Sequence, residues 1–469
     1  MLQIHYIRVS FARSVLFLVL GLALVALVAC SSGGDDPTDN GGKSSGGGTP
    51  SSSSISSSGG GTPSSPSGSS SSGGGISSSG GGNSSPSGPG DINVENVIKI
   101  EFKSGSAPVI TNTFSEVTIT PTGENVVIRI PNAPDDKEPK YNFVITGTAS
   151  NGSVKFYGDA RKSIYLNGAS ITNSKGPAIN IQGGKRVNVH LVEKTQNFLT
   201  DGPTYDTPPN GEQAKGTFFS EGKLEFEGTG SLEVKGKYNH AIVVDNDFEL
   251  KNGKIIVKES AKDGIHVNHK IEVKGGELDI TSQGDAIQNE RNDSIKIWGG
   301  KIKALTTGIK SHGIASDSGA VSIGGNATIQ ISVSGDGSKG IRVRNWVEFI
   351  DQSTTTIETK GTKYVDPAAP GDDSNASGIK ATKDIFIEGG TLTIKSLGTE
   401  AKGINTDGSA TIEAKKPVTV KVEADNNAIK ATGTLTIESG TVTLKSVTTK
   451  AINAGTYNKK GGTVTIEEK

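Results

Sequence analysis

Four aspartates in the middle of the chain have a spacing that suits cation binding. Asp245 and Asp247 follow Ile242 by three and five residues, and Asp263 and Asp285 each precede an isoleucine by two. Calcium takes six to eight oxygen ligands, largely from carboxylates and carbonyls. The four residues therefore predict a calcium site, because carboxylates held close together repel unless a cation or a proton lies between them. The alternative is that Asp only suits the turn before each Gly or Ala.

Basic residues recur at one position of a repeated pattern. The residue after a small-residue–Ile pair is basic in four of the five units from Ile309 to Ile429, namely Lys310, Arg342, Lys380 and Lys430, with Asn405 as the exception. In an alternating strand this position points outward. A line of cations could contact the carboxylates of an acidic sugar polymer. The alternative is a soluble face whose lysines prevent pairing with other strands.

Aromatic residues make up only 5% of the chain, so those at outward positions are informative. The repeat aligns Trp298, Trp346 and Phe386 with charged or polar residues of other units. A flat ring exposed on a strand face can stack on a sugar ring. These three residues are therefore predicted to contact carbohydrate. The alternative is that a loop covers them and they belong to a satellite core.

Other chemistry finds little support in the sequence. His266 and His269 lie three apart in an extended stretch and are expected on opposite faces, while His240 and His312 belong to other units, so no histidine site is predicted. Cys30 is the only cysteine, which argues against zinc. We find no nucleotide-binding loop and no serine-hydrolase elbow. No catalytic residue is predicted.

A repeat of about two dozen residues must position these side chains. The small-residue–Ile pairs fall at Ile179, Ile242, Ile265, Ile287, Ile309, Ile341, Ile379, Ile404, Ile429 and Ile452. Many intervals are 22–25 residues, a period typical of solenoids. A leucine-rich repeat would need a Leu ladder, which is absent. Short alternating strands with Gly or Ala corners predict an all-β fold, a parallel β-helix whose isoleucines stack inside.

Longer intervals predict where loops leave this rod. The interval between Ile179 and Ile242 contains "TDGPTYDTPPNGEQAKG" and at least one further coil, and the interval before Ile379 contains "KYVDPAAPGDDSNAS". Loops that leave a solenoid cluster on one side. Residues 98–150 are less regular and are predicted to form a β-rich N-terminal cap.

The first 90 residues are not expected to belong to the fold. Residues 1–30 have a basic start, an apolar run and the ending Leu-Val-Ala-Cys, which resembles the bacterial lipobox with Cys30 as the lipidated residue. An ordinary signal peptide is the alternative. Residues 31–90 are Ser, Gly and Pro with few hydrophobes and predict a disordered linker. We expect an exported protein that a lipid anchors to a bacterial membrane, at the outer membrane or the cell surface. Residues 91–469 are expected to form its folded domain.

One family resemblance adds to this interpretation. Between residues 141 and 305 the chain contains Leu-Asn-Gly, Thr-Asp-Gly, Gly-Thr-Gly-Ser-Leu and Tyr-Asn-His-Ala-Ile in that order. In these elements it resembles a bacterial family of polysaccharide-lyase-like, carbohydrate-binding β-helix lipoproteins. The resemblance implies a right-handed β-helix, binding of cellulose and acidic pectin-like glycans, bound calcium and no established catalysis. The family's Asp-Asp-Gly-Ile corner keeps one Asp at Asp263 and at Asp285 and none later, so calcium is expected only in the N-terminal half.

These observations favour non-catalytic binding of plant cell-wall polysaccharide. A net charge of −1 gives no strong field for nucleic acid. A calcium-dependent polysaccharide lyase on the same fold is the main alternative, with Lys310 or Arg342 as its base. A structural surface adhesin is the third. The sequence indicates no oligomeric state.

Overall fold

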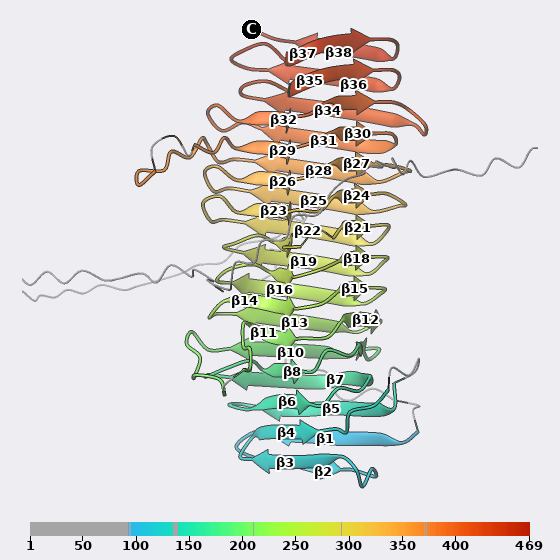
Figure 1. The fold of residues 1–469 in the computed structure, drawn as a ribbon, viewed down its shortest axis with the longest axis vertical. Helices are drawn as coiled ribbons and strands as arrows, with labels where there is room; N and C mark the ends of the chain where they lie inside the picture. The colour runs from blue at the N-terminus through green and yellow to red at the C-terminus, as the bar shows by residue number, and fades with distance from the viewer. Residues whose placement is uncertain are drawn as a thin grey trace, which may run out of the picture. The chain divides into compact units, whose positions relative to one another are not determined.

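The computed structural model describes residues 92, 95–134, 139–209, 211–291, 293–369, 371 and 373–469. The predicted signal peptide, Cys30 and the linker lie outside these residues. The described residues contain 38 β-strands and no helix, hence no helix that could cross a bilayer. The strands wind into stacked coils, so the predicted all-β parallel β-helix is confirmed (Figure 1).

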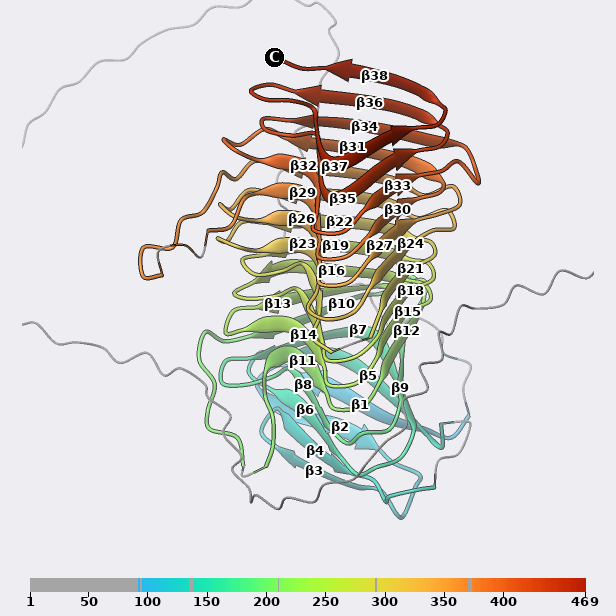
Figure 2. The same ribbon diagram turned by 45° about the horizontal axis from the view of Figure 1, so that its top comes forward.

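Each coil contributes one strand to each of three parallel stacks, which separate in the oblique view of Figure 2. Stack 1 consists of β4 (Asn125–Arg129), β6 (Ser153–Tyr157), β8 (Ile179–Gln182), β11 (Gly216–Ser220), β14 (His240–Val244), β17 (Ile265–Val267), β20 (Ile287–Asn289), β23 (His312–Ser316), β26 (Lys339–Val343), β29 (Ser377–Ala381), β32 (Lys402–Thr406) and the first halves of β35 (Ile429–Ile437) and β37 (Ile452–Lys459).

Stack 2 consists of β1 (Val97–Lys103), β5 (Tyr141–Ala149), β7 (Lys162–Asn173), β9 (Val187–Leu191), β12 (Leu224–Gly228), β15 (Phe248–Leu250), β18 (Ile271–Val273), β21 (Ile295–Ile297), β24 (Val321–Ile323), β27 (Val347–Phe349), β30 (Ile385–Ile387), β33 (Ala410–Ile412) and the second halves of β35 and β37. Stack 3 begins at the ends of β5 and β7 and continues with β10 (Gln196–Asp201), β13 (Ser231–Gly236), β16 (Lys254–Ser260), β19 (Glu277–Ser282), β22 (Lys301–Thr306), β25 (Thr328–Val333), β28 (Thr354–Thr359), β31 (Gly390–Ser396), β34 (Val418–Ala424), β36 (Thr441–Ser446) and β38 (Thr463–Glu467).

The N-terminal end differs from the other coils. β2 (Ser106–Thr111) pairs antiparallel with β1, and β3 (Thr118–Thr122) pairs antiparallel with β4. β1 then pairs parallel with β5, and β4 with β6, which starts the regular coils. The β-rich cap expected over residues 98–150 therefore corresponds to β1–β5.

The core isoleucines form one column along stack 1, as predicted, with one correction. Ile287 is the register partner of Ile314, and Ile314 is the partner of Ile341. Ile309 is 62% exposed, so its assignment to the column is wrong. The sequence offers two Gly-Ile pairs five residues apart, and the first lies in a turn that lengthens this coil to 27 residues. The coil expected between Ile179 and Ile242 is present as β11, β12 and β13, with Phe218 in the core column.

Two long loops leave the rod at the same corner. Residues 202–215 connect β10 to β11, and residues 360–376 connect β28 to β29, so both lead from stack 3 to stack 1. Both project on the left side of the view in Figure 1. The predicted one-sided clustering of the loops is therefore confirmed, and stack 1 is the face beside them.

The two isoleucines of the lengthened coil give a matched test of this register. Ile314→Ala should destabilise the protein by about 2–5 kcal/mol, because it leaves a cavity in a tightly packed column. Ile309→Ala should change stability by less than about 0.5 kcal/mol, because that side chain is exposed. Urea denaturation measures both. An equal loss of stability in the two variants would contradict the register.

Candidate functional site

A groove of about 560 Å³ lies along the outer face of stack 1 in its C-terminal half. Its floor comes from β26, β29, β32 and β35. The outward residues Arg342, Lys380, Asn405 and Lys430 are register partners on these successive strands. Asp373 and Ser374, from the loop between β28 and β29, also line the groove. The structure thus brings together three of the four basic residues predicted from the sequence.

Lys310 does not continue this column, because Ala315 is the register partner of Arg342. Lys310 lies in the turn before β23 with a left-handed backbone (φ 54°). Its Nζ lies 4.9 Å from the Tyr364 ring centre and 3.9 Å from Asp366 Oδ2. The prediction was wrong about its register, yet Lys310 lines a cavity of about 420 Å³ that shares Lys339, Arg342 and Arg344 with the groove.

Only part of the positive charge in this region is paired. Arg342 forms an ion pair with Asp317, and Lys380 forms one with Asp407. Arg344 and Lys430 form no ion pair with any residue that the structure describes. This leaves two cations available to an anion in the groove.

The amine of Lys339 is buried next to other basic side chains of this region. Its Nζ donates a hydrogen bond to the Gly337 carbonyl at 2.6 Å. Burial, followed by the charges of Arg342, Lys380 and Lys310, lowers the pKa of Lys339 to about 8. Basic side chains are thus concentrated around Lys339, and such a concentration favours a negatively charged ligand.

A second column, two residues before the core isoleucines, is polar although it is buried. It contains His240, Asp263, Asp285, His312 and Lys339. Each backbone N–H donates to the side chain one coil before it, with distances of 3.2, 2.8, 2.6 and 3.0 Å along the series. Asp263 and Asp285 thus lie on adjacent coils, as predicted. The expectation that the histidines stay apart was wrong for His240 and His266, whose ring centres are 4.4 Å apart.

Neighbouring residues, rather than solvent, determine the protonation states of the side chains in this column. Burial raises the pKa of Asp263, but its contacts with His240 and His266 outweigh burial and hold the pKa well below the usual range. Burial lowers the pKa of His266, whereas its bonds to Asp263 and Glu290 raise it to about 9. Burial and the neighbouring Asp263 raise the pKa of Asp285 well above its usual value, which favours the neutral acid.

The structure does not gather the four predicted aspartates into one site. Asp245 accepts a hydrogen bond from Asn268 at 3.1 Å, and Asp247 accepts one from the Lys270 N–H at 3.2 Å, both after the end of β14. Asp263 and Asp285 instead lie before β17 and β20. Their oxygens are occupied by backbone N–H groups and imidazoles. The four aspartates are therefore divided between two places and do not together supply the six to eight oxygens of one calcium site.

The three predicted aromatic residues are half-buried and lie on different parts of the rod. Trp298 follows β21, and its ring lies against Gly324 of the next coil. Phe386 points outward from β30, between Glu348 and Thr411. Trp346 precedes β27 and follows Arg344, which lines the groove, by two residues. Trp298 and Phe386 therefore belong to stack 2, and Trp346 lies in the turn that leads from β26 to stack 2.

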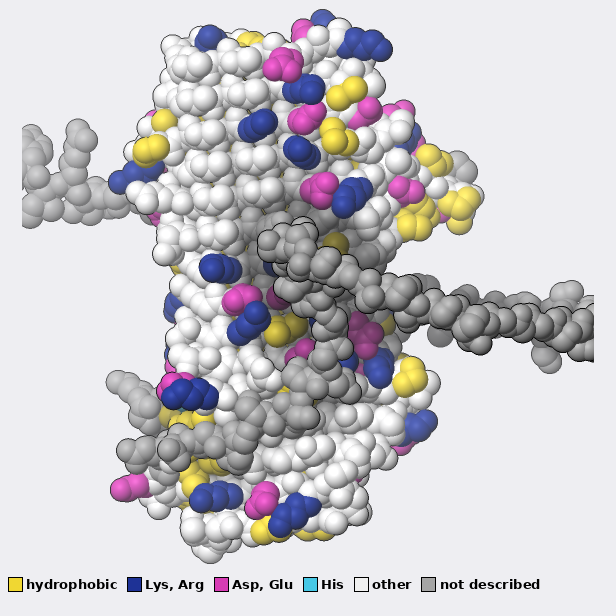
Figure 3. Space-filling model, turned by 180° about the vertical axis from the view of Figure 1, so that it is seen from behind, with side chains coloured by type: hydrophobic (Ala, Val, Ile, Leu, Met, Phe, Trp, Pro, Cys, Tyr) yellow, Lys and Arg dark blue, Asp and Glu magenta, His cyan; other side chains and the backbone are white. Residues whose placement is uncertain are grey.

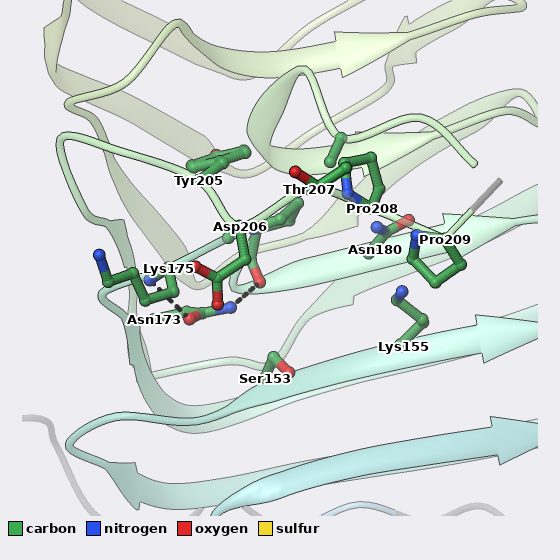
Figure 4. Close-up of a pocket in the computed structure, with 13 residues that line it drawn as sticks. Ser153, Lys155, Asn173, Lys175, Asn180, Tyr205, Asp206, Thr207, Pro208 and Pro209 are labelled. Atoms are coloured by element: carbon green, nitrogen blue, oxygen red, sulfur yellow. Dashed lines mark hydrogen bonds between the residues drawn. The ribbon is translucent and has the colours of Figure 1, made fainter. Parts of the chain in front are cut away.

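A smaller pocket lies under the Pro-rich loop that precedes β11. Its volume is about 230 Å³, and Tyr205, Asp206, Pro208 and Pro209 face Asn173, Asn180 and Lys155 across it (Figure 4). The polar groups are largely occupied within the protein. Asn173 donates to the Pro177 carbonyl at 2.8 Å and accepts from the Lys175 N–H at 3.0 Å. Sequence reasoning missed this pocket, because only the folded loop brings these residues together.

Stack 2 carries a column of glutamates instead of cations. Glu225, Glu249 and Glu272 are register partners on successive coils. Lys223 lies 2.7 Å from both Glu225 and Glu249, and Lys251 lies 3.0 Å from Glu225. Over the side of the rod seen in Figure 3, basic and acidic side chains are likewise interspersed. The concentration of cations in the groove is thus a local feature.

The charge arrangement around Glu225 predicts a pH dependence of stability. Burial raises the pKa of Glu225, but its bonds to Lys223 and Lys251 lower it to about 2, from the usual 4.5. The folded-state pKa lies below the unfolded one, so Glu225 stabilises the fold above about pH 4.5, and this contribution is lost as the pH falls towards 2. We expect Glu225→Gln to lower stability at pH 7 by about 1–2 kcal/mol, allowing for solvent screening of the lysines.

Urea denaturation of the wild type and Glu225→Gln at pH 7 and pH 2.5 measures this difference. It should shrink strongly at the lower pH. The control is Glu259→Gln, since Glu259 is exposed. The same stability difference at both pH values would show that the lysine contacts do not stabilise the charged glutamate.

The fold and the groove define a class, a parallel β-solenoid with a charged outer surface along its coils. The model of the carbohydrate-binding domain-containing protein family matches residues 116–417, which is more than half of the chain. The chain therefore belongs to this family.

Two known proteins are similar to the chain. A carbohydrate-binding domain-containing protein of Acetivibrio thermocellus is 28% identical over 119 residues, which is 25% of this chain and 42% of that protein. The match thus spans less than half of that relative. A solved structure, the polysaccharide lyase-like protein from C. thermocellum in a gadolinium derivative, is 20% identical with a TM-score of 0.41. That similarity covers 64% of this chain and 97% of the solved chain.

Proposed function

We propose that this protein binds an acidic polysaccharide of the plant cell wall, of the pectin type, along the groove of stack 1, without catalysing its cleavage. The observation that carries the proposal is the column of Arg342, Lys380 and Lys430, in a groove where Arg344 and Lys430 form no ion pair with the residues that the structure describes. Family membership supports carbohydrate as the ligand class. The acidic character of the glycan follows from the charge of the groove.

The geometry of the groove favours a polymer over a small sugar. Neighbouring coils are about 4.8 Å apart, so Arg342 and Lys380 are one spacing apart and Lys430 lies two coils further on. A polyuronate has a carboxylate on every sugar. One chain that lies parallel to the rod axis can therefore meet several cations at once. Binding at several weak contacts raises the total affinity without a deep cavity.

Stack 2 is the surface proposed for neutral glycan. Trp298 and Phe386 lie three coils apart there, roughly 15 Å along the rod. A cellulose chain parallel to the axis would reach both rings, whereas a short oligomer would not. Calcium assistance at Asp245 and Asp247, and lipid anchoring through Cys30 by the linker of residues 31–90, complete the proposal.

A polysaccharide lyase is the second candidate, favoured by one observation. Lysine is protonated at neutral pH at its ordinary pKa, but Lys339 has its pKa lowered to about 8 and lies in the cavity that Lys310 and Arg342 also line. A base of this kind can remove the proton beside a uronate carboxyl group. Against it, the Lys339 amine already donates to Gly337 and Ser374. Ultraviolet-absorbing unsaturated product from polygalacturonate would establish the lyase and replace our proposal.

Removing the cations of the column tests the groove directly. We expect the triple variant Arg342→Gln, Lys380→Gln and Lys430→Gln to bind polygalacturonate at least about tenfold more weakly, because charge complementarity is lost. Binding of the wild type should weaken with salt, and that of the variant should do so less. The matched control removes three exposed lysines of stack 3 by Lys301→Gln, Lys303→Gln and Lys421→Gln.

Isothermal titration with polygalacturonate, repeated with a chelator, measures these affinities. Equal weakening in the triple variant and in the stack 3 control would mean that only overall charge matters. Full retention of affinity in the triple variant would place the acidic glycan elsewhere. Loss of binding with the chelator alone would support calcium assistance.

Single aromatic substitutions separate the two surfaces. Trp346→Ala should weaken binding to polygalacturonate, because Trp346 lies two residues after Arg344, which lines the groove. Trp298→Ala and Phe386→Ala should weaken binding to cellulose by about 1 kcal/mol each, at the lower end of the scale for stacking on an aromatic ring. Thermal melting checks that each variant folds, and pull-down on each glycan measures binding. If Trp298→Ala unfolds the domain and leaves binding per folded molecule unchanged, its indole is core.

A further inference from the structure

Three side chains from two adjacent coils converge on one point at the corner before stack 1. The Nδ1 atom of His266 lies 2.9 Å from Asp263 Oδ2, and Nδ1 of His240 lies 3.1 Å from the same oxygen. All three potential ligand atoms lie within 4.8 Å of one another. The side chains are only 10–12% exposed, so the cluster is nearly closed to solvent.

Surrounding contacts fix the orientation of these donors. The second oxygen of Asp263, Oδ1, accepts the backbone N–H of Asp285 at 2.8 Å, which leaves Oδ2 directed at the two imidazoles. The far nitrogen of His266, Nε2, lies 3.0 Å from Glu290 Oε1. A carboxylate on the outer nitrogen of a histidine is the arrangement that orients metal-binding imidazoles. Gln288 Oε1, 3.1 Å from His266 Nδ1, adds a fourth donor from the next coil.

We propose that His240, Asp263 and His266 bind a zinc ion or a similar divalent transition metal, with Gln288 as a further oxygen ligand. Two imidazole nitrogens with carboxylate and carbonyl oxygens suit zinc, cobalt or nickel rather than calcium. Zinc–nitrogen and zinc–oxygen bonds of about 2.0–2.2 Å need only a small opening of the present contacts. The metal would replace the contacts of His266 Nδ1 with Asp263 Oδ2 at 2.9 Å and Gln288 Oε1 at 3.1 Å. It would also replace the 3.2 Å hydrogen bond from the Asp263 N–H to His240 Nδ1.

Such an ion would join three successive coils. His240 belongs to β14, Asp263 lies two residues before β17, His266 belongs to β17, and Gln288 belongs to β20. Because the ligands come from different coils, the ion would stabilise the folded solenoid, as any ligand of the native state does. The site is structural and separate from the cationic groove, so it goes beyond the proposed glycan binding.

The experiment uses the full chain without a polyhistidine tag, stripped with a chelator and titrated with zinc, cobalt, calcium or magnesium. We expect one zinc per chain by elemental analysis, a rise in melting temperature, and zinc affinity at least about 100-fold above that for calcium. His240→Gln and His266→Gln should each reduce zinc affinity more than about 100-fold. Glu290→Gln, which removes only the outer carboxylate, should reduce it about 10–100-fold.

The matched control is His269→Gln. His269 also contacts a carboxylate, Asp293 at 2.9 Å, but it lies outside the cluster and should leave zinc affinity unchanged. The proposal is overturned if the wild type takes up no zinc, if it prefers calcium, or if His240→Gln and His266→Gln keep wild-type affinity. If those two variants fail to fold, the zinc stoichiometry of the wild type and the zinc affinity of Glu290→Gln test the proposal instead. No glycan is present, so failure of glycan binding leaves the result unaffected.

Discussion

Every coil of this solenoid is hydrogen-bonded in register to the next at about 4.8 Å, and this spacing constrains the whole molecule. Each side chain faces its own counterpart one coil away, as Ile265 faces Ile287. A residue type that recurs at one position of the repeat must therefore also pack against a second copy of itself on the next coil. Where the corner is tightest only glycine fits, since a Cβ at Gly340 would lie 2.2 Å from Ile357 Cγ2. The repeat in the sequence is a consequence of this contact.

The same spacing brings like charges of successive coils close together, and their repulsion is reduced by different contacts on each face. Like charges about 4.8 Å apart repel, and burial makes the repulsion stronger. On stack 2, Lys223 bridges Glu225 and Glu249, and Lys251 and Lys274 each pair with one of these glutamates. On stack 1, Asn405 interrupts the cations, and Asp317 and Asp407 pair with two of them. The remaining positive charge is concentrated beside the long loop, although the chain as a whole carries only −1.

Sequence reasoning could predict the parts of the fold that repeat and not the parts that interrupt the repeat. The isoleucine column, the strand character and both loops follow from the period and from Gly, Pro and Asn. Ile309 and Lys310 were misplaced because two Gly-Ile pairs compete in one coil, and only packing shows that Ile314 is buried. Phe218 was invisible as a core residue because no small-residue–Ile pair marks its coil.

The cluster of His240, Asp263 and His266 shows most clearly what prediction from the sequence missed. Spacing along the chain predicted opposite faces for His266 and His269, and on that basis no site was expected. The signal is in the neighbouring coil, because the position two before a core isoleucine lies beside the position one after it. His240 and His266 occupy these two positions on adjacent coils, with Asp263 between them. A search of the sequence that compared positions across one repeat length, rather than along one strand, would have found the cluster.

The position of the groove on the outer face of stack 1 also determines which kind of ligand it can bind tightly. The groove of stack 1 is shallow and extends across four strands, so no single coil encloses a ligand. Each coil can offer one or two contacts, which are weak alone in the presence of water and salt. Useful affinity then requires a ligand that repeats along the same axis as the protein. The loop of residues 360–376 adds Asp373 and Ser374 to the groove lining, so its contacts come from a loop as well as from the repeated strand positions.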